Sequence, residues 1–366
     1  MKIIQIIPYI GSGGAERFVV DLSNELAQIG HEVLLCTLYA MDGSMGFYKR
    51  DINHKVKVVT LNKGLGLSLR TIMKFMNVVK KEKPDLIHSH IGALQYSFLS
   101  QVFQSRGYHT VHNEAHLEAK GYLEILLRKF AFKLGLVTPI TVSKESHDSF
   151  VSFYNKNAYQ INNGRSISNI IVSQRVKDEI KSYMPNDNTR VIVQVARFQE
   201  QKNIPLMARV TKRLYNDGYN FSLLFIGNTE KTQIREEVER EKSVCAHILG
   251  ERHNPLEYLK EAGCFALSSL YEGMPISLIE AFSVGAIPVC TPVGGIPNAV
   301  INGENGILSK DTSEDAYYEA LKAYLEMPDD QVQLMREKAL RSYEPYNMTE
   351  CAKKYMDVFM ENEKIK

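Results

Sequence analysis

Apolar residues in the first half of the chain form short runs of strand length that alternate with longer stretches of helical period. Residues 2–7 are almost continuously apolar, whereas residues 15–29 repeat apolar positions three and four residues apart. By the same criteria we expect strands at 2–7, 31–38, 56–61, 85–90, 108–111 and 139–142, and helices at 15–29, 68–81, 92–105, 117–136 and 144–153. Strands that alternate with helices and lack tight hairpin turns predict a parallel sheet covered by helices on both faces.

The alternation restarts after Pro185–Asn188, a turn-rich segment that we interpret as the end of an interdomain region. The second half is expected to contain strands at 190–195, 221–226, 244–249, 264–267 and 287–290, and helices at 204–217, 229–242, 255–261, from 275 and from 313 onward. The prediction is therefore an α/β protein with two Rossmann-like, doubly wound domains, 1–165 and 166–345, facing each other across a cleft. In such sheets ligands bind beyond the carboxyl ends of the strands.

Composition narrows the class of protein. A chain of 366 residues, 44% hydrophobic and 23% charged, has enough apolar residues for two globular cores. A net charge of +2 argues against a nucleic-acid binder held mainly by phosphate contacts. The five cysteines form no CxxC pair, which favours reduced thiols and a cytoplasmic location. No apolar stretch reaches membrane-spanning length, so we expect a soluble or peripheral protein.

Two carboxylates flank an expected helix start in the stretch 268–285. Glu272 precedes the helix and Glu280 lies within it. Backbone N–H groups at 273–276 would be free to bind an anion, with the positive end of the helix dipole behind them. A surface helix with two solvated acids is the alternative. Against it, Glu280 lies in an almost uncharged run and needs a partner, which a ligand hydroxyl would supply.

Two further loops follow expected strands. The loop Gly11–Arg17 opens a helix but has Glu16 at the third glycine position of the dinucleotide fingerprint, and it lacks the Gly-Lys-Ser/Thr of a P-loop. Its glycines would let a ligand approach a helix N-terminus, although a plain tight turn is the alternative. In the second half, Arg197 and Lys202 could clamp a diphosphate, whereas solvated loop cations are the alternative.

Histidines cluster around the end of the strand expected at 108–111. His112 and His116 have the spacing of a zinc pair, but Asn113 stands where a zincin requires Glu, so no metal site is expected. At a strand end, His112 is better placed as a hydrogen-bond donor or general acid/base, with an ordinary satisfied histidine as the alternative. His88 and His90 face the same way at strand period and are expected to be structural or to line the cleft.

Taken together, the chain resembles the retaining glycosyltransferases of family 4, which have the GT-B fold, over essentially its whole length. The motifs that carry the resemblance are Glu272 and Glu280 with seven residues between them, Arg197 with Lys202, the Gly-Gly-Ala-Glu-Arg sequence at 13–17, His112, and Gly294–Gly295. The resemblance implies a nucleotide-diphosphate sugar as co-substrate, with UDP as the favoured carrier. It implies no cofactor and no metal, which agrees with the lack of an Asp-x-Asp motif.

The resemblance also assigns roles to individual residues. Glu280 would accept hydrogen bonds from ribose hydroxyls and Glu272 from hydroxyls of the donor sugar. Arg197 and Lys202 would stabilise the diphosphate leaving group. The expected catalytic residues are His112, Glu272, Arg197 and Lys202, and the expected donor-binding residues are Gly13, Gly14, Arg197, Lys202, Glu272, Gly273, Met274, Pro275 and Glu280. Replacing Glu272 by Ala is expected to lower turnover sharply, with the small stability loss of a surface substitution, ~0.5 kcal/mol.

Two features at the domain borders bear on the resemblance. The family's last helix commonly crosses back to the first domain, which implies that residues 346–366 pack there. Asn163–Gly164 is followed by Arg165 and Ser166 where the family often has Val-Asp, so the interdomain contact is expected to differ.

The acceptor is expected to bind the first domain. The helix expected at 117–136 carries apolar residues beside basic ones, which are Lys120, Arg128, Lys129 and Lys133. This pattern is compatible with peripheral contact to an anionic membrane and also with a helix packed on its sheet with a solvated basic face. We expect a glycan or lipid-linked acceptor at the inner face of a bacterial plasma membrane.

The function expected from the sequence is therefore transfer of a hexose or N-acetylhexosamine in bacterial surface polysaccharide biosynthesis, such as capsule or O-antigen. A sugar-nucleotide epimerase or a sugar-phosphate-using synthase of the same fold is the nearest alternative. A non-catalytic nucleotide-sugar-binding protein and a metal hydrolase based on His112 and His116 are the alternatives from other classes.

Overall fold

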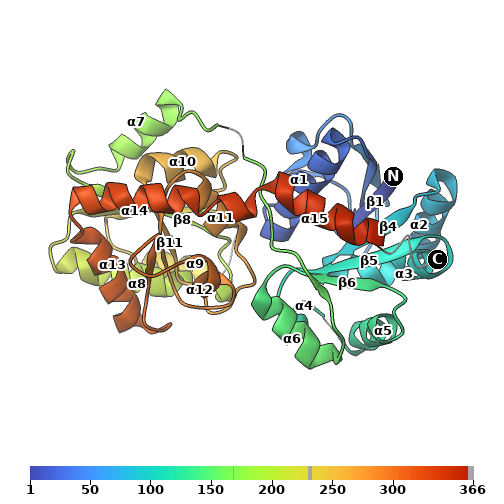
Figure 1. Ribbon diagram of the computed structural model, residues 1–366. Coiled ribbons are helices and arrows are strands. Elements are labelled where there is room, and N and C mark those ends of the chain that lie inside the picture. The colour runs from blue at the N-terminus through green and yellow to red at the C-terminus, as the bar shows by residue number, and fades with distance from the viewer. Residues whose placement is uncertain (120, 168, 230–232, 362–366) are drawn as a thin grey trace. The chain divides into compact units, whose positions relative to one another are not determined.

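The chain folds into two units in a computed structural model that describes residues 1–119, 121–167, 169–229 and 233–361 (Figure 1). The N-terminal unit comprises Met1–Ser166 with the returning segment Tyr346–Lys366, and the C-terminal unit comprises Ile167–Pro345. Three parts of the expected elements lie outside the described residues, namely Lys120, residues 230–232 and residues 362–366.

A parallel sheet forms the centre of the N-terminal unit. Within the described residues it has seven strands in the order β3-β2-β1-β4-β5-β6-β7. Their bounds are β1 Lys2–Ile7, β2 Glu32–Thr37, β3 Lys57–Thr60, β4 Leu86–His90, β5 Arg106–Val111, β6 Thr138–Thr141 and β7 Tyr159–Gln160. Every pair is parallel, which confirms the prediction. The order reverses between β1 and β4, where ligands bind in folds of this kind.

Helices cover both faces of this sheet. They are α1 Gly14–Gln28, α2 Leu69–Glu82, α3 Leu94–Phe103, α4 Ala115–Glu118, α5 Tyr122–Lys133, α6 Lys144–Tyr154 and α15 Met348–Glu361, with short 3-10 turns at Gly43–Gly46, Lys49–Asp51, Ile91–Ala93 and Glu344–Tyr346. Because side chains alternate along a strand, Ile4 and Ile6 pack with Phe75 of α2 on one face. His88 on the other face lies beside Tyr355 of α15.

The returning helix α15 is fixed to the N-terminal unit by packing and by hydrogen bonds. It packs against α1, and Arg106 Nη1 donates to the carbonyl oxygen of Phe359 at 2.7 Å (Figure 1). At its approach, the Arg165 amide donates to the Tyr346 carbonyl, and the Arg165 guanidinium donates to Asp21 Oδ2 at 2.7 Å. Arg165, which departs from the family pattern, is therefore buried in an ion pair with α1.

The helix expected at 117–136 is wrong as a single element. It is two helices, α4 and α5, with the chain between them passing through Gly121 at φ +95°. That conformation favours glycine, which lacks the Cβ that would be strained there. No helix among the described residues has both the length and the apolarity required to cross a bilayer.

The C-terminal unit repeats the architecture. In the part of the chain that the structure describes, its sheet has six parallel strands in the order β10-β9-β8-β11-β12-β13. The strands are β8 Arg190–Val195, β9 Phe221–Ile226, β10 Ala246–Gly250, β11 Cys264–Leu267, β12 Ile287–Cys290 and β13 Ile307–Leu308. The helices are α7 Gln174–Ser182, α8 Ile204–Asn216, α9 Gln233–Glu241, α10 Pro255–Ala262, α11 Ile276–Ser283, α12 Ile296–Ala299, α13 Glu314–Leu325 and α14 Asp329–Arg341, with a 3-10 turn at Glu200–Lys202.

The sequence did not predict α7, which lies in the segment taken as interdomain. Its only buried residues are Val176 and Ile180, four positions apart, and they face α10. A single apolar pair in a nine-residue polar helix is too weak a periodic pattern to identify from sequence. The short elements β7, β13 and α12 were missed for the same reason.

Only glycine fits at position 227, directly after β9, because the ends of two strands lie close together there. Gly227 adopts φ +151°, and a Cβ there would lie 1.9 Å from the carbonyl oxygen of Ala196, which follows β8. The loops after β8 and β9 therefore fit together only when residue 227 has no side chain.

We predict that Gly227→Ala lowers the free energy of unfolding by about 4 kcal/mol, because a backbone carbonyl cannot move aside as a side chain can. Gly218→Ala is the matched control, since its φ is also positive, +89°, but open space surrounds it. Gly218→Ala should lower the free energy of unfolding by about 1 kcal/mol, from backbone strain alone. Urea unfolding followed by circular dichroism measures both, and equal losses would contradict the assignment.

Candidate functional site

Three neighbouring strands of the C-terminal sheet end around one side chain, Glu272. The segment after β8 is joined to the segment after β11, because Leu270 N donates to the Gln201 carbonyl at 2.8 Å and Gln201 Nε2 donates to the Tyr271 carbonyl at 2.9 Å. The strand order reverses between β8 and β11, so Glu272 lies at the switch point of this sheet.

Glu272 is held by three polar partners. Lys202 Nζ lies 2.5 Å from Oε1, Ser269 Oγ donates to Oε1 at 2.6 Å, and Gln201 Nε2 donates to Oε2 at 3.2 Å. The residue is only 4% exposed. The expectation that Glu272→Ala behaves as a surface substitution is therefore wrong, because the change would leave the Lys202 ammonium half-buried without its carboxylate.

The loop after β12 closes on the same place. Gly295 N donates to the Gly273 carbonyl at 2.8 Å, and a Cβ at Gly294 would lie 1.9 Å from the carbonyl oxygen of Glu272. Thr291 Oγ1 donates to the Ser269 carbonyl at 2.6 Å. The glycine pair therefore allows the loop after β12 to support the backbone of the Glu272 segment.

The two cations expected beside the acids have different environments. Lys202 is bound to Glu272, so part of its charge is already compensated. Arg197 is half-buried two residues after β8, and among the described residues its guanidinium has no carboxylate partner. Arg197 is thus the cation of this edge that remains available for an anion.

Helix α11 begins one residue later than expected. Pro275 is its N-cap residue, with Gly273 and Met274 in the preceding loop, and the amides of Ile276 and Ser277 fall in the first turn, where helices leave N–H groups unpaired. Glu280 lies on α11 and is 6% exposed. The structure therefore buries both acids of the motif, which excludes the alternative of two solvated surface glutamates.

The glycine loop of the N-terminal unit lies at the end of β1, where Gly13 is the N-cap residue of α1. The side chain of Glu16 folds back over it, since a Cβ at Gly13 would lie 2.0 Å from Glu16 Oε2. A buried carboxylate at this helix start was not expected, although an acid in the first turn of a helix is a common stabilising position.

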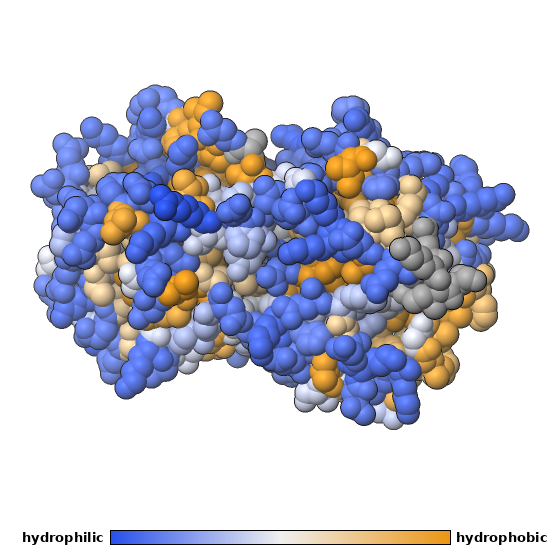
Figure 2. Space-filling model, viewed as in Figure 1, coloured by the Kyte–Doolittle hydropathy of each residue, from blue (hydrophilic) through white to orange (hydrophobic). Residues whose placement is uncertain are grey.

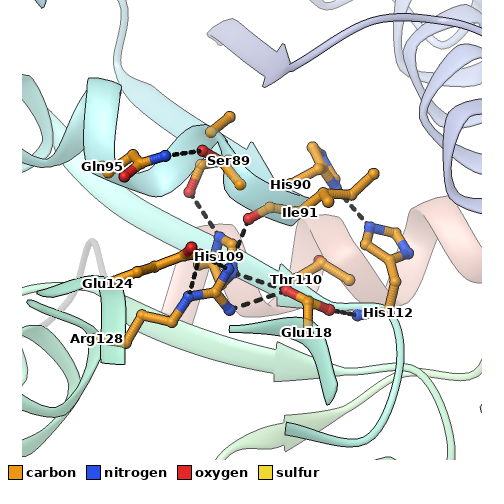
Figure 3. Close-up of polar contacts among 12 residues, drawn as sticks. Ser89, His90, Ile91, Gln95, His109, Thr110, His112, Glu118, Glu124 and Arg128 are labelled. Carbon is orange, nitrogen blue, oxygen red and sulfur yellow. Dashed lines mark hydrogen bonds and ion pairs between the residues drawn. The ribbon is translucent and has the colours of Figure 1, made fainter. Parts of the chain in front are cut away.

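His112 follows β5 in the same unit, is half-buried and adjoins the buried histidines His88, His90 and His109 (Figure 3). Its Nε2 lies 3.0 Å from His90 Nδ1, and the rings of His88 and His90 lie 4.1 Å apart, as their strand spacing indicates. His112 precedes α4 and therefore does not share a helix face with His116, which is exposed. Within the described ranges no group of three His, Cys, Asp or Glu side chains could hold a metal ion.

A buried ion pair behind His112 was missed from the sequence. Glu118 Oε2 accepts from the His112 amide at 2.6 Å, and its Oε1 accepts from Arg128 Nη1 at 2.9 Å (Figure 3). Arg128 Nη2 also donates to the Ile91 carbonyl at 2.8 Å. Arg128 is 0% exposed, so its assignment to a solvated or membrane-facing basic surface is wrong. Its position on the inward side of α5, four residues after Glu124, is the only sequence pattern that could have identified it.

Burial controls the protonation of this cluster. Removal from water lowers the pKa of His112 and of His109 to about 4, and it holds the pKa values of His88 and His90 well below their ordinary value. Burial alone would raise the pKa of Glu118, but contact with His109 and the charge of Arg128 hold it well below its usual range. The four rings are therefore neutral at pH 7, beside an ionised carboxylate.

The two halves of the chain match two different family models. Residues 12–193 match the family model described as Glycosyltransferase Family 4, and residues 176–341 match the model described as Glycosyl transferases group 1. An amylovoran biosynthesis glycosyltransferase of Erwinia amylovora is 24% identical over 314 residues, which cover 83% of this chain and 84% of that protein.

Two further similarities extend over nearly the whole chain. A UDP-Gal:alpha-D-GlcNAc-diphosphoundecaprenol alpha-1,3-galactosyltransferase of Escherichia coli is 23% identical over 392 residues, which cover 98% of this chain and 96% of that protein. The crystal structure of Anabaena HepE in complex with UDP and glucose superposes with a TM-score of 0.84 at 16% identity, covering 99% of this chain and all of that one.

We predict that stability falls as the pH is lowered from 7.5 to 5.5. His109 and His112 have folded pKa values of about 4, below the ordinary 6.5, so the unfolded chain binds more protons throughout this window. Below its unfolded pKa, each such histidine lowers the free energy of unfolding by about 1.4 kcal/mol for every pH unit. Urea unfolding at the two pH values measures the slope, and His109→Gln should reduce it. Equal stability at both values would contradict the prediction.

Proposed function

We propose that this chain, which belongs to the family 4 (group 1) glycosyltransferases and has the GT-B fold, transfers a hexose or N-acetylhexosamine from a UDP-sugar with retention of anomeric configuration. The observation that carries the proposal is the convergence of three strand ends on buried Glu272, with Lys202 bound to it and the Arg197 guanidinium uncompensated nearby. A carboxylate can accept hydrogen bonds from the hydroxyls of the sugar, and a neighbouring cation can bind the diphosphate. The two groups together therefore suit a nucleotide sugar.

In this proposal the polar groups around Glu272 bind different parts of the donor. Glu272 accepts hydrogen bonds from hydroxyls of the transferred sugar and Glu280 from the ribose. Arg197 and Lys202 stabilise the diphosphate as the bond to the sugar breaks and negative charge grows on the leaving oxygen. The first amides of α11 and the backbone amides of Gly273 and Met274 donate to the same phosphates, and Pro275, which has no N–H, lies beside them in the donor site.

The N-terminal unit completes the proposed reaction. The backbone at Gly13 and Gly14 contacts the donor phosphates, and His112 contacts the transferred sugar at the reacting carbon. A phosphate oxygen of the departing UDP takes the proton of the attacking acceptor hydroxyl on the same face of the sugar, which gives retention without a protein nucleophile. Protein cations perform the charge stabilisation that a divalent ion supplies elsewhere, so we propose a reaction independent of metal.

The donor and acceptor classes are supported by similar proteins. The Anabaena structure holds UDP and glucose, and the Escherichia coli relative uses UDP-Gal and a diphosphoundecaprenol-linked acceptor. The Erwinia relative acts in amylovoran biosynthesis. We therefore propose a glycan or lipid-linked acceptor in the assembly of a bacterial surface polysaccharide such as capsule or O-antigen.

An exposed apolar surface on α3 and α5 supports peripheral contact with a membrane. These two helices pack together through Phe98 and Phe130, and their outer sides carry seven exposed apolar residues, Leu99, Phe103, Tyr122, Leu123, Leu126, Phe130 and Leu134. Figure 2 shows apolar side chains gathered on the part of the N-terminal unit where α5 lies. Exposed Lys129 and Lys133 flank them, which suits a surface that enters an anionic interface.

Arg197→Met should lower kcat about a hundredfold, the effect of removing one donor from a preorganised anion site. Arg175→Met is the matched control, because Arg175 is exposed on α7. A thermal-shift screen of nucleotide sugars selects the donor, and UDP release with a lipid-linked acceptor measures turnover. Unchanged kcat in Arg197→Met, or an inverted anomer by NMR of the product, would refute the corresponding part of the proposal.

Leu123→Asp together with Phe130→Asp should abolish flotation with liposomes that contain phosphatidylglycerol, because both side chains are mostly exposed, at 77% and 54%, and would enter the interface. Leu334→Asp in α14 is the control, since Leu334 is exposed to the same degree as Phe130. If the unmodified protein does not float with anionic liposomes, the membrane part of the proposal fails.

A further inference from the structure

His90 has no task in the proposed reaction, yet its ring is fully buried and both of its nitrogens have partners. Nε2 lies 2.7 Å from Oε1 of Gln5 on β1, and Nδ1 lies 3.0 Å from Nε2 of His112 after β5. Gln5 is also fully buried. A line of three polar side chains on adjacent strands therefore ends at His112, one of the proposed catalytic residues.

The partners determine where the protons lie. Gln5 Oε1 can only accept, so His90 Nε2 carries a proton and donates it to that oxygen. His90 is neutral, so its Nδ1 then has a lone pair and must accept from His112 Nε2. His112 in turn has its proton on Nε2 and a lone pair on Nδ1. That Nδ1 is an acceptor without a protein partner among the described residues.

The two rings cannot turn away from each other easily. Phe18 of α1 packs edge-on against His112 with 5.6 Å between ring centroids, and His88 lies 4.1 Å from His90. Arg128 also holds the backbone at both residues, through Glu118, which accepts from the His112 amide, and through the Ile91 carbonyl, which directly follows His90. Ile91 adopts φ +54°, which is unfavourable for a β-branched residue and requires such support.

We propose that His90 is a positioning residue that, with Gln5, fixes His112 as the Nε2–H tautomer and directs the Nδ1 lone pair to a hydroxyl of the transferred sugar. The role in sugar binding rests on the proposed function, whereas the tautomer does not. A sugar hydroxyl that donates to Nδ1 would satisfy the acceptor that the protein leaves unpaired. A His112 with its proton on Nδ1 would instead present a donor and lose that hydrogen bond.

Two substitutions at residue 90 separate the two nitrogens. In His90→Asn, the side-chain oxygen can occupy the position of Nδ1 and still accept from His112, while the contact with Gln5 is lost. In His90→Gln, the amide nitrogen can occupy the position of Nε2 and still donate to Gln5, while the acceptor for His112 is lost. Both are polar and smaller than histidine, so they serve as controls for each other in folding and stability.

Long-range ¹H–¹⁵N NMR of ring-labelled protein reports the tautomer of His112 directly, without any substrate. We expect the Nε2–H form in the unmodified protein and in His90→Asn, and a loss of that preference in His90→Gln. The Nδ1–H form in the unmodified protein would overturn the proposal, and so would an unchanged tautomer in His90→Gln.

Activity provides the second readout, with UDP-glucose and UDP-N-acetylglucosamine as probes and slow UDP release in the absence of acceptor as the assay. His90→Gln should lower kcat/KM about tenfold, the effect of one hydrogen bond, and His90→Asn should remain within twofold. Equal losses in both variants, in parallel with their melting temperatures, would show a merely structural residue and overturn the positioning role. If the unmodified protein turns over no donor, the proposed function fails, while the NMR result still decides the tautomer.

Discussion

Burial of a parallel sheet on both faces is the constraint on which the rest of this structure depends. Helices cover each side of both sheets, so side chains in the middle of a strand are mostly apolar, and buried polar ones such as Gln5, His88 and Gln194 form at least one hydrogen bond. Charged groups that need a ligand can then lie only beyond the carboxyl ends, in the loops that enter the helices or on the helices that follow. Glu272, Lys202 and Arg197 occupy such loops of the C-terminal sheet, and His112 occupies one of the N-terminal sheet, each near the switch point of its own sheet.

Several ion pairs among the described residues contain buried charged groups. Glu272 is bound to Lys202, Glu118 to Arg128, and Asp21 to Arg165. The pairs of Glu272 and of Asp21 join segments that are distant in sequence, whereas Glu118 and Arg128 are ten residues apart, and each pair fixes a loop or a returning segment as well as satisfying a charge. The histidine cluster follows the other route, because burial keeps its rings neutral and lets them form directional hydrogen bonds, such as the one between His90 and His112.

Much of the fold could be predicted because its elements are long and strongly periodic. The strands β1, β8, β9, β11 and β12 have the predicted bounds. Errors occurred where local pattern is weak. The break at Gly121 divides a helix whose apolar pattern continues on both sides, and α7 has one buried pair. The sequence identified Glu272 as a candidate site residue but did not predict its burial, since an acid is usually solvated unless a distant partner such as Lys202 reaches it.

The sequence alone determined most of the succession of strands and helices, the position of most candidate residues near strand ends, and the resemblance to family 4 glycosyltransferases. These depend on period, turn chemistry and motif spacing, which are local properties of the chain. Only the tertiary structure decided that Lys202 pairs with Glu272, that Arg128 is buried behind His112, and that Gln5 and His90 form a line leading to the His112 ring. The physical reason is that hydrogen bonds and ion pairs depend on distances between residues far apart in sequence, which the order of strands in a sheet fixes and a linear pattern does not.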